Sequence, residues 1–345
     1  MDSHATTNLH AEETLRELLA PIQELLEDPS IDEIMINSPT EVWIEKRGEK
    51  VRTGIVVDNT SLRAAIQTLG RLDNKDVTAG GEHSLVDTRL TGLRVAAGLS
   101  PCAVEGNFLC IRKHRTMVLP LQSYGDDQTV EHLREFIRAR KNILISGGTS
   151  SGKTTFINAM IGEFDKDDRL VILEDTVELV IENPNRLRLC TNEQQKVTMR
   201  SLVKLTLRAR PDRIVLGEIR GPEAFDLMQA MNTGHDGCMA SIHANSAKAA
   251  LSRLETLVLT ANTGWPIEAI RHEIGNTVHG LVHMERGAGG KRRIAEIIAV
   301  EGYGPDGYEL NVLYDKRKEE GNENLEEPGA AGASIAPRLL GVRSA

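Results

Sequence analysis

Aromatic residues are scarce in this chain of 345 residues, at 3% of the total. Aliphatic side chains must therefore fill its cores, and a surface on which nucleic-acid bases stack is not expected. A basic surplus is missing too, because the formal net charge is −9 at pH 7. Proteins dedicated to binding DNA or RNA usually carry a positive surplus, so the composition disfavours direct contact with nucleic acid.

Long apolar runs are also absent. No uninterrupted run reaches the roughly 18 residues of a membrane-spanning helix, and residues 1–10 lack the apolar core of a secretory signal. We therefore expect a cytoplasmic protein whose association with a membrane is peripheral. No CxxC pair occurs among the cysteines, which predicts reduced thiols and no zinc site. These cysteines are Cys102, Cys110, Cys190 and Cys238.

Hydrophobic patterning predicts two domains. Short alternating strands, helical spacing over 14–26 and a helix over 61–72 predict a small α+β domain over residues 1–113. The segment 114–129 has no clear period and is predicted to be a linker. From 130 to 315, buried strands alternate with helices, which favours a mostly parallel sheet. The tail, 316–345, is rich in Glu, Gly, Ala and Pro, and we expect it to be disordered.

Apolar runs bounded by turn residues predict the strands of the second domain, and helical periodicity predicts the segments between them. The expected strands are 142–146, 170–173, 214–216, 239–242, 280–284 and 294–300. The expected helices are 152–161, 199–209, 222–231, 247–259 and 266–276.

A glycine-rich motif follows the first of these strands. Residues 147–154 run Gly-Gly-Thr-Ser-Ser-Gly-Lys-Thr and match GxxxxGK[ST] without a gap. Glycines let backbone N–H groups converge on a phosphate, and the following helix presents its positive end. Lys153 would reach the β- and γ-phosphates, and the Thr154 hydroxyl would take a position on Mg²⁺. The alternative is a plain glycine-rich turn. The pattern predicts an ATP site made by Gly147, Gly148, Thr149, Ser150, Ser151, Gly152, Lys153, Thr154 and Thr155.

Two acidic residues follow buried strands and could act on a bound nucleotide. Glu174 follows the strand 170–173, and Glu218 follows the strand 214–216 after one glycine. In an ATPase one carboxylate would serve the metal shell and another would polarise the attacking water. The residues alone leave open which carboxylate is the base. The alternative for each is a solvated acid at the end of a strand.

Four blocks together resemble the secretion ATPase superfamily, the hexameric motors of type II and type IV secretion and of type IV pili. They are the phosphate loop, 173–179, 210–221, and a histidine block over 233–245. Within the superfamily the likeness is greatest to the conjugal-transfer ATPase of type IV secretion systems. A tetracysteine module and the signature of retraction motors are both missing, and the N-terminal domain is short. The resemblance implies an α/β fold, with a RecA-like P-loop NTPase core and a small α+β N-terminal domain.

The resemblance also implies roles for single residues. Glu174 would be the general base or would position the water, and Glu218 would serve the Mg²⁺ shell. His243 would sense the γ-phosphate, whereas a lone histidine is more often a structural one. Arg94 and Arg112 match positions that reach the nucleotide phosphates and stabilise transition-state charge. Ordinary strand-face arginines are the alternative for both.

The predicted function is a ring-forming ATPase that uses Mg²⁺ to hydrolyse ATP for type IV secretion or conjugal transfer. The resemblance implies a homo-oligomer, a hexamer, at the cytoplasmic face of the inner membrane, with proteins of the secretion or pilus machinery as partners. One alternative is a pilus assembly or retraction motor of the type IV or tight-adherence class. Others are a helicase-like ring and an ATP-binding scaffold without turnover. The sequence leaves the cargo and the ring size open.

Overall fold

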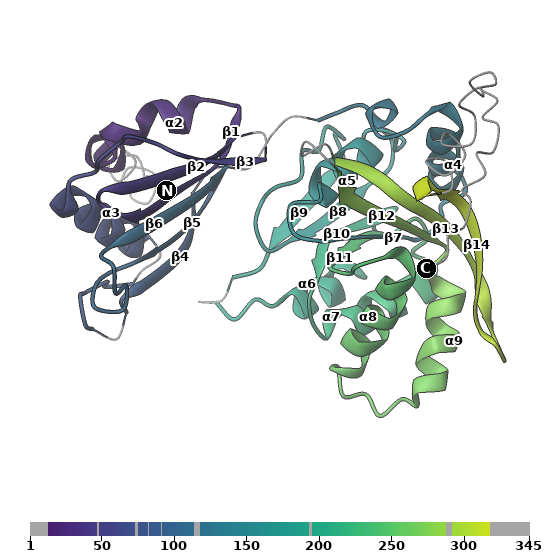
Figure 1. Ribbon diagram of the computed structural model, residues 1–345. Helices are drawn as coiled ribbons and strands as arrows, with labels where there is room; N and C mark the ends of the chain where they lie inside the picture. Colours follow the sequence, from purple (N-terminus) through teal and green to yellow (C-terminus); the bar gives the residue numbers. More distant parts are fainter. Residues whose placement is uncertain are drawn as a thin grey trace, which may run out of the picture.

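The computed structural model describes residues 13–46, 48–72, 75–81, 83–90, 92–113, 118–192, 195–287 and 292–317. Among these residues, strands form a six-stranded sheet near the N-terminus and an eight-stranded sheet in the rest of the chain. The two sheets belong to separate bodies that lie side by side (Figure 1). No helix of the described residues is both long and apolar enough to cross a bilayer.

The N-terminal sheet is antiparallel throughout, in the order β3-β2-β1-β6-β5-β4. Helix α3 (Asn59–Leu72) packs on it, with its buried Leu62 and Ile66 in the same core as Ile34 and Ile36 of β1. The remaining elements are η1 (Ala20–Ile22), α2 (Gln23–Glu27), β1 (Ile31–Ser38), β2 (Glu41–Lys46), β3 (Glu49–Arg52), β4 (Leu85–Leu90), β5 (Leu93–Gly98) and β6 (Phe108–Lys113).

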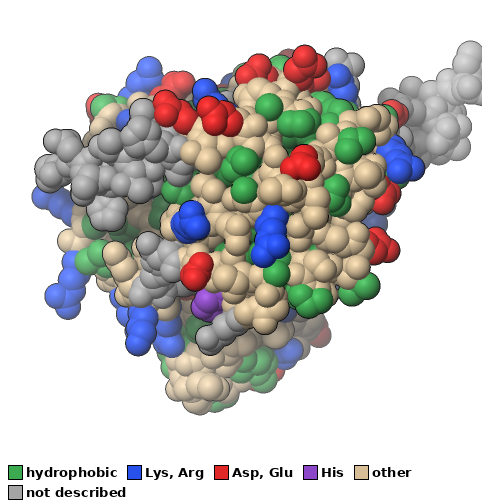
Figure 2. Space-filling view, turned by 90° about the vertical axis from the view of Figure 1, so that its left-hand side faces the viewer, with side chains coloured by type: hydrophobic (Ala, Val, Ile, Leu, Met, Phe, Trp, Pro, Cys, Tyr) green, Lys and Arg blue, Asp and Glu red, His purple; other side chains and the backbone are tan. Residues whose placement is uncertain are grey.

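Charge is mixed on the face of the molecule seen from its N-terminal side. Figure 2 shows Lys and Arg side chains scattered there among acidic and hydrophobic ones. The described side chains of this face form no continuous basic surface of the kind that follows a nucleic-acid backbone.

The eight-stranded sheet has the order β14-β13-β12-β7-β11-β10-β8-β9. Its strands from β12 to β9 run parallel, and β13 and β14 add an antiparallel edge. The strands are β7 (Ile143–Gly147), β8 (Leu170–Glu174), β9 (Arg186–Cys190), β10 (Arg213–Ile219), β11 (Met239–Ile242), β12 (Gly280–Arg286), β13 (Arg292–Gly304) and β14 (Gly307–Asp315).

Helices cover both faces of this sheet, because successive strand residues point to opposite sides. Leu144 of β7 packs in one core with α6 (Met199–Thr206), α7 (Glu223–Asn232), α8 (Ala247–Leu259) and α9 (Ile267–Thr277). Its neighbours Ile143 and Ile145 pack in the other core, with η2 (Leu121–Ser123), α4 (Asp127–Arg138) and α5 (Lys153–Ile161). The α/β fold with a mostly parallel sheet is confirmed, and each strand predicted for this part of the chain is present.

The structure differs from the prediction in the segment 114–129. Helix α4 begins within it, with Asp126 as its N-cap. Leu121 and Tyr124 are buried in the core around α5, so the second half of this segment packs on the eight-stranded sheet. The sequence favoured a linker because these apolar residues follow neither a helical nor a strand period. The domain boundaries stay a prediction, and the tail predicted to be disordered lies outside the described residues from 318 onward.

Candidate active site

The predicted phosphate loop connects β7 to α5. Gly147 ends β7 with φ at +157°, and Gly152 caps α5 with φ at +93°. A Cβ at Gly147 would lie 2.5 Å from the carbonyl oxygen of Met284, and closer still to Ser151 Oγ. Only glycine fits there without displacing β12. The turn thereby brings backbone N–H groups to the positive end of α5, as a phosphate requires.

Lys153 is the first residue of α5 and turns back onto the loop. Its Nζ donates to the carbonyls of Gly147 at 2.9 Å and Gly148 at 3.1 Å. Burial lowers the pKa of Lys153, and the nearby Glu218 carboxylate opposes this shift. The ammonium and the loop amides together suit a polyphosphate, whose charge would stabilise the buried cation.

Two side-chain oxygens that could bind a metal ion lie together beside the start of α5. Thr154 Oγ1 donates to Glu178 Oε2 at 3.2 Å. Hydroxyl and carboxylate oxygens are ligands that Mg²⁺ accepts, usually together with substrate phosphates and water. These side chains therefore fit a magnesium ion next to the phosphate loop. Glu178 lies in the acidic block 173–179 but is not among the predicted site residues.

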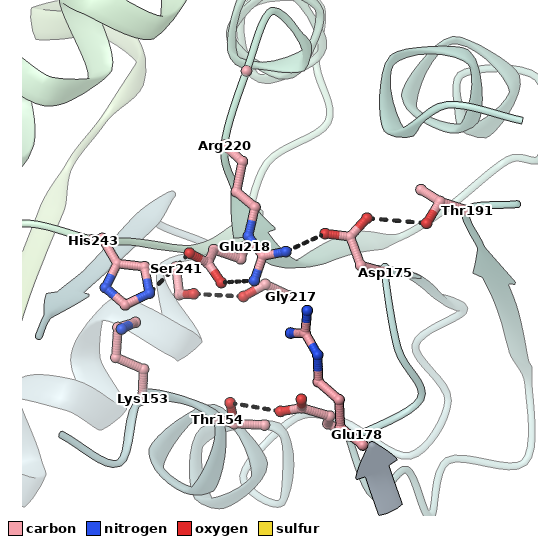
Figure 3. Close-up of polar contacts among 12 residues, drawn as sticks. Lys153, Thr154, Asp175, Glu178, Thr191, Gly217, Glu218, Arg220, Ser241 and His243 are labelled. Atoms are coloured by element: carbon pink, nitrogen blue, oxygen red, sulfur yellow. Dashed lines mark hydrogen bonds and ion pairs between the residues drawn. The ribbon is translucent and has the colours of Figure 1, made fainter. Parts of the chain in front are cut away.

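Glu218 lies between a histidine and an arginine (Figure 3). Its Oε1 is 3.0 Å from His243 Nε2, and its Oε2 accepts from Arg220 Nη2 at 2.7 Å. Arg220 also pairs with Asp175 at 3.0 Å, and Asp175 accepts from the Thr191 hydroxyl at 3.0 Å. The hydrogen bond to Glu218 is the main cause that raises the pKa of Arg220. A continuous polar chain thus joins the ends of β11, β10 and β8.

His243 comes directly after β11, and its side chain keeps 45% of its surface exposed. Burial of the rest lowers its pKa, and the positive charge of Lys153 lowers it further. The Glu218 carboxylate opposes this shift, and the lowered pKa favours the neutral imidazole at pH 7. Figure 3 shows Lys153 pointing toward His243 and Glu218, so one ammonium, one carboxylate and one neutral imidazole converge.

Glu174 has different surroundings. It is 2% exposed, and its Oε1 accepts from the backbone amides of Glu178 and Leu179, each at 2.8 Å. Its Oε2 lies 3.3 Å from Arg188 Nε. Burial is the main cause that raises the pKa of Glu174, and the two amides oppose it. The carboxylate is thus bound to the turn at 178–179. Sequence reasoning missed Arg188, whose only signal is its place in the alternating run of β9.

Arg94 and Arg112 lie across from the phosphate loop, on β5 and β6, where they pair directly in the sheet. Arg94 Nη2 is 3.2 Å from Asp87 Oδ2, and Arg112 Nε is 3.7 Å from Glu33 Oε1. Like charges at directly opposed positions repel one another. The site would relieve that repulsion if an anion entered from the side of the phosphate loop.

One cleft between the two bodies brings the predicted site residues together. It is lined by Thr149, Ser150, Ser151, Gly152, Lys153, Thr154, Thr155, Glu174, Glu218, His243, Arg94 and Arg112. Gly147 and Gly148 are absent from that lining, because Gly147 packs beneath the loop and Gly148 opens toward a neighbouring hollow. Glu178, Asp175 and Arg220 also line the cleft. This placement leaves the chemical roles of these residues as predictions.

Comparison with known proteins gives consistent relatives. Residues 16–288 match the family described as type II/IV secretion system protein. The chain is 36% identical over 293 residues to the conjugal transfer protein TrbB of Rhizobium radiobacter, which covers 82% of this chain and 88% of that protein. It is 31% identical over 290 residues to the protein VirB11 of the same species, with coverage of 74% and 84%. The structure of the ATPase DotB of Legionella pneumophila aligns with a TM-score of 0.62 at 19% identity, covering 88% and 82%. That likeness is one of fold.

Proposed function

The chain belongs to the family of type II/IV secretion system proteins, and from this membership we propose that it hydrolyses ATP to drive type IV secretion or conjugal transfer. The observation that carries the proposal is the convergence of Lys153, Glu218 and His243 in one cleft with the phosphate loop. The similarity to a conjugal transfer protein supports the biological role.

In the proposed mechanism the loop amides and Lys153 hold the β- and γ-phosphates of ATP. Lys153 would exchange its bonds to loop carbonyls for bonds to phosphate oxygens. Thr154 and Glu178 would hold Mg²⁺, with Glu218 facing the same shell. When bound, the ion neutralises charge that builds on the phosphate oxygens.

We assign the attacking water to Glu218. Its Oε1 points toward His243 and the phosphate loop, and the neutral imidazole can share a proton or a water with it. Glu174 is instead anchored to the turn at 178–179: its Oε1 accepts from two backbone amides, and its Oε2 lies 3.3 Å from Arg188 Nε without a hydrogen bond. We propose that Glu174 positions the turn carrying Glu178. The family resemblance implied that Glu174 acts on the water, whereas this proposal gives that role to Glu218.

Arg94 and Arg112 would approach the γ-phosphate from the N-terminal body. In that position they stabilise charge in the transition state and make domain position depend on the nucleotide. A homohexameric ring at the cytoplasmic face of the inner membrane, in contact with the secretion machinery, completes the proposal. Support for the ring comes from the family alone, and mass measurement with and without ATP and Mg²⁺ tests it.

The direct test is Lys153→Ala, with Lys166→Ala as the matched control on the exposed surface of the same domain. Loss of the ammonium removes charge stabilisation at the phosphates, and we expect hydrolysis to fall by at least about 100-fold. Lys166→Ala should hydrolyse ATP at the wild-type rate. Near-normal turnover by Lys153→Ala contradicts the site. Wild-type protein that binds ATP but leaves it intact in a single-turnover assay identifies a scaffold.

A further inference from the structure

A row of polar side chains that the proposed chemistry does not use lies beside the phosphate loop. Ser146 of β7, His283 of β12 and Glu296 of β13 occupy directly paired positions on three neighbouring strands. Ser146 is fully buried and precedes Gly147 in the sequence. Its Oγ lies 2.9 Å from His283 Nδ1. The base of the phosphate loop is therefore hydrogen-bonded to β12.

The backbone of β12 supports the same point. Met284, which follows His283, pairs with Gly147 in the sheet. Its carbonyl oxygen occupies the space that a Cβ at Gly147 would need. Any shift of His283 along β12 would therefore move Met284 against Gly147, the first residue of the phosphate loop.

Glu296 connects this row to the loop that carries His243. Its Oε2 accepts from the backbone amide of Ala247, the first residue of α8, at 3.1 Å. A carboxylate at the N-terminus of a helix is favoured by the helix dipole. Ser246, the N-cap of α8, also lies close to the row, with its carbonyl 3.4 Å from Ser146 Oγ. The start of α8, four residues after His243, is therefore anchored to β13 and β7.

The segment after β14 reaches the same carboxylate. Arg317 contacts the Glu296 carboxylate, and its Nε lies 3.4 Å from Asp315 Oδ1. The Glu296 side chain keeps 13% of its surface exposed, whereas that of Arg317 keeps 75%. Glu296 thus has one donor from the interior, the α8 amide, and one from the surface.

We propose that His283 and Glu296 are positioning residues that fix the spacing between the phosphate loop and the His243 loop. The proposal rests on the proposed ATPase for its catalytic consequence. Lys153 begins α5 and His243 directly follows β11, and the pairing of β7 with β11 brings the two residues near each other. The row adds side-chain contacts to that pairing, from Ser146 to His283 and from Glu296 to the start of α8. Relaxing it should misplace His243 and Glu218 relative to the phosphates while leaving the phosphate loop able to bind.

The variants are Glu296→Ala and Glu296→Gln, with Glu285→Ala as the control. Glu285 is a carboxylate on the same hairpin, and its Oε1 accepts from Arg293 Nε at 2.6 Å. Glu296→Ala leaves the Ala247 amide without its acceptor, and we expect kcat to fall about 10- to 100-fold, the range for misplacement near 1 Å. KM for ATP should change by less than about 3-fold. A variant that misplaces only groups acting in the transition state loses kcat without losing ground-state binding of ATP. Glu296→Gln keeps an acceptor oxygen and should recover most of kcat.

A second measurement needs no hydrolysis. Amide hydrogen exchange without nucleotide should become faster at residues 243–249 in Glu296→Ala, and should stay unchanged in α7 and in Glu285→Ala. His283→Ala should speed exchange at residues 146–152. If kcat and exchange in Glu296→Ala match those of Glu285→Ala, or if kcat falls and KM rises by equal factors, the positioning role is wrong. If the wild type hydrolyses nothing while the exchange changes appear, the proposed ATPase fails and the positioning row stands.

Discussion

Exchanging each of two glutamates for glutamine separates a positioning carboxylate from one that acts on water. Glu174→Gln keeps the side-chain shape and an oxygen that can accept from the amides of Glu178 and Leu179. We expect it to hydrolyse ATP within about 10-fold of the wild-type rate. Glu218→Gln removes the carboxylate beside His243, and removal of a general base costs about 100- to 10,000-fold.

The effects on stability should have the opposite order, with the larger loss at Glu174. Glu174→Ala leaves one buried and one partly buried amide without an acceptor, and a hydrogen bond to a charged group contributes about 1.5–3 kcal/mol. Relief from burying the carboxylate, the cause of its raised pKa, offsets part of that loss. The net cost should be about 2–3 kcal/mol, which lowers Tm by about 4–12 °C for a domain of this size. Glu218→Ala should cost less, because its carboxylate is 18% exposed.

The assay combines single-turnover hydrolysis with thermal unfolding on the same preparations. Glu182→Gln, an exposed carboxylate in the same segment, serves as the control and should match the wild type in both. A loss of 100-fold or more in Glu174→Gln at unchanged Tm would identify Glu174 as the base. That result would refute our proposal that Glu174 Oε1, bound to two backbone amides, serves to position the turn.

Three further outcomes are expected. Arg94→Ala and Arg112→Ala should each lower kcat/KM for ATP about 10-fold or more in steady-state assays, as loss of a phosphate-facing arginine does. Their Tm in thermal melting should be nearly unchanged. The ion pair between Arg286 and Glu45, 3.1 Å apart, joins the two bodies; Arg286→Glu should open them in small-angle scattering, and the added change Glu45→Arg should close them again. Burial lowers the pKa of His243 from 6.5, so below that pH the unfolded chain binds a proton that the folded chain resists. Tm should therefore fall as pH drops through this range, and His243→Gln should flatten that part of the curve.

The fold of the second body could be predicted because parallel strands buried on both faces are continuous apolar runs. Ile143-Leu144-Ile145 is one, and its neighbours in the sheet share that pattern. Edge strands carry a weaker signal. β9 alternates Arg and Leu with all but its first residue half-buried, and β14 leaves Val312 46% exposed, so neither stood out from a loop. Helix α4 was missed because its cap, Asp126, lies in a segment with no apolar period.

The candidate site divides in the same way. The phosphate loop is a contiguous motif whose geometry its own residues dictate, and so it was visible in the sequence. The partners of Glu174 were not, because they depend on how the turn at 178–179 folds back on β8 and on Arg188 from an adjacent strand. Sequence spacing placed two carboxylates at one sheet edge, but only side-chain contacts distinguish the one facing His243 from the one facing the turn.

The paired arginines give a physical reason why nucleotide state could move one body against the other. Arg94 and Arg112 oppose each other on adjacent strands, each with one nearby carboxylate. An empty cleft leaves their mutual repulsion uncompensated, whereas a γ-phosphate between them and Lys153 would attract both arginines. A ligand shifts a conformational equilibrium only by its difference in affinity for the two states. ATP and ADP differ at the γ-phosphate, the group that the arginines would contact in a closed cleft and lose in an open one. Hydrolysis would therefore remove the attraction that holds the cleft closed, and Glu45 and Arg286 would be left to set how far it opens.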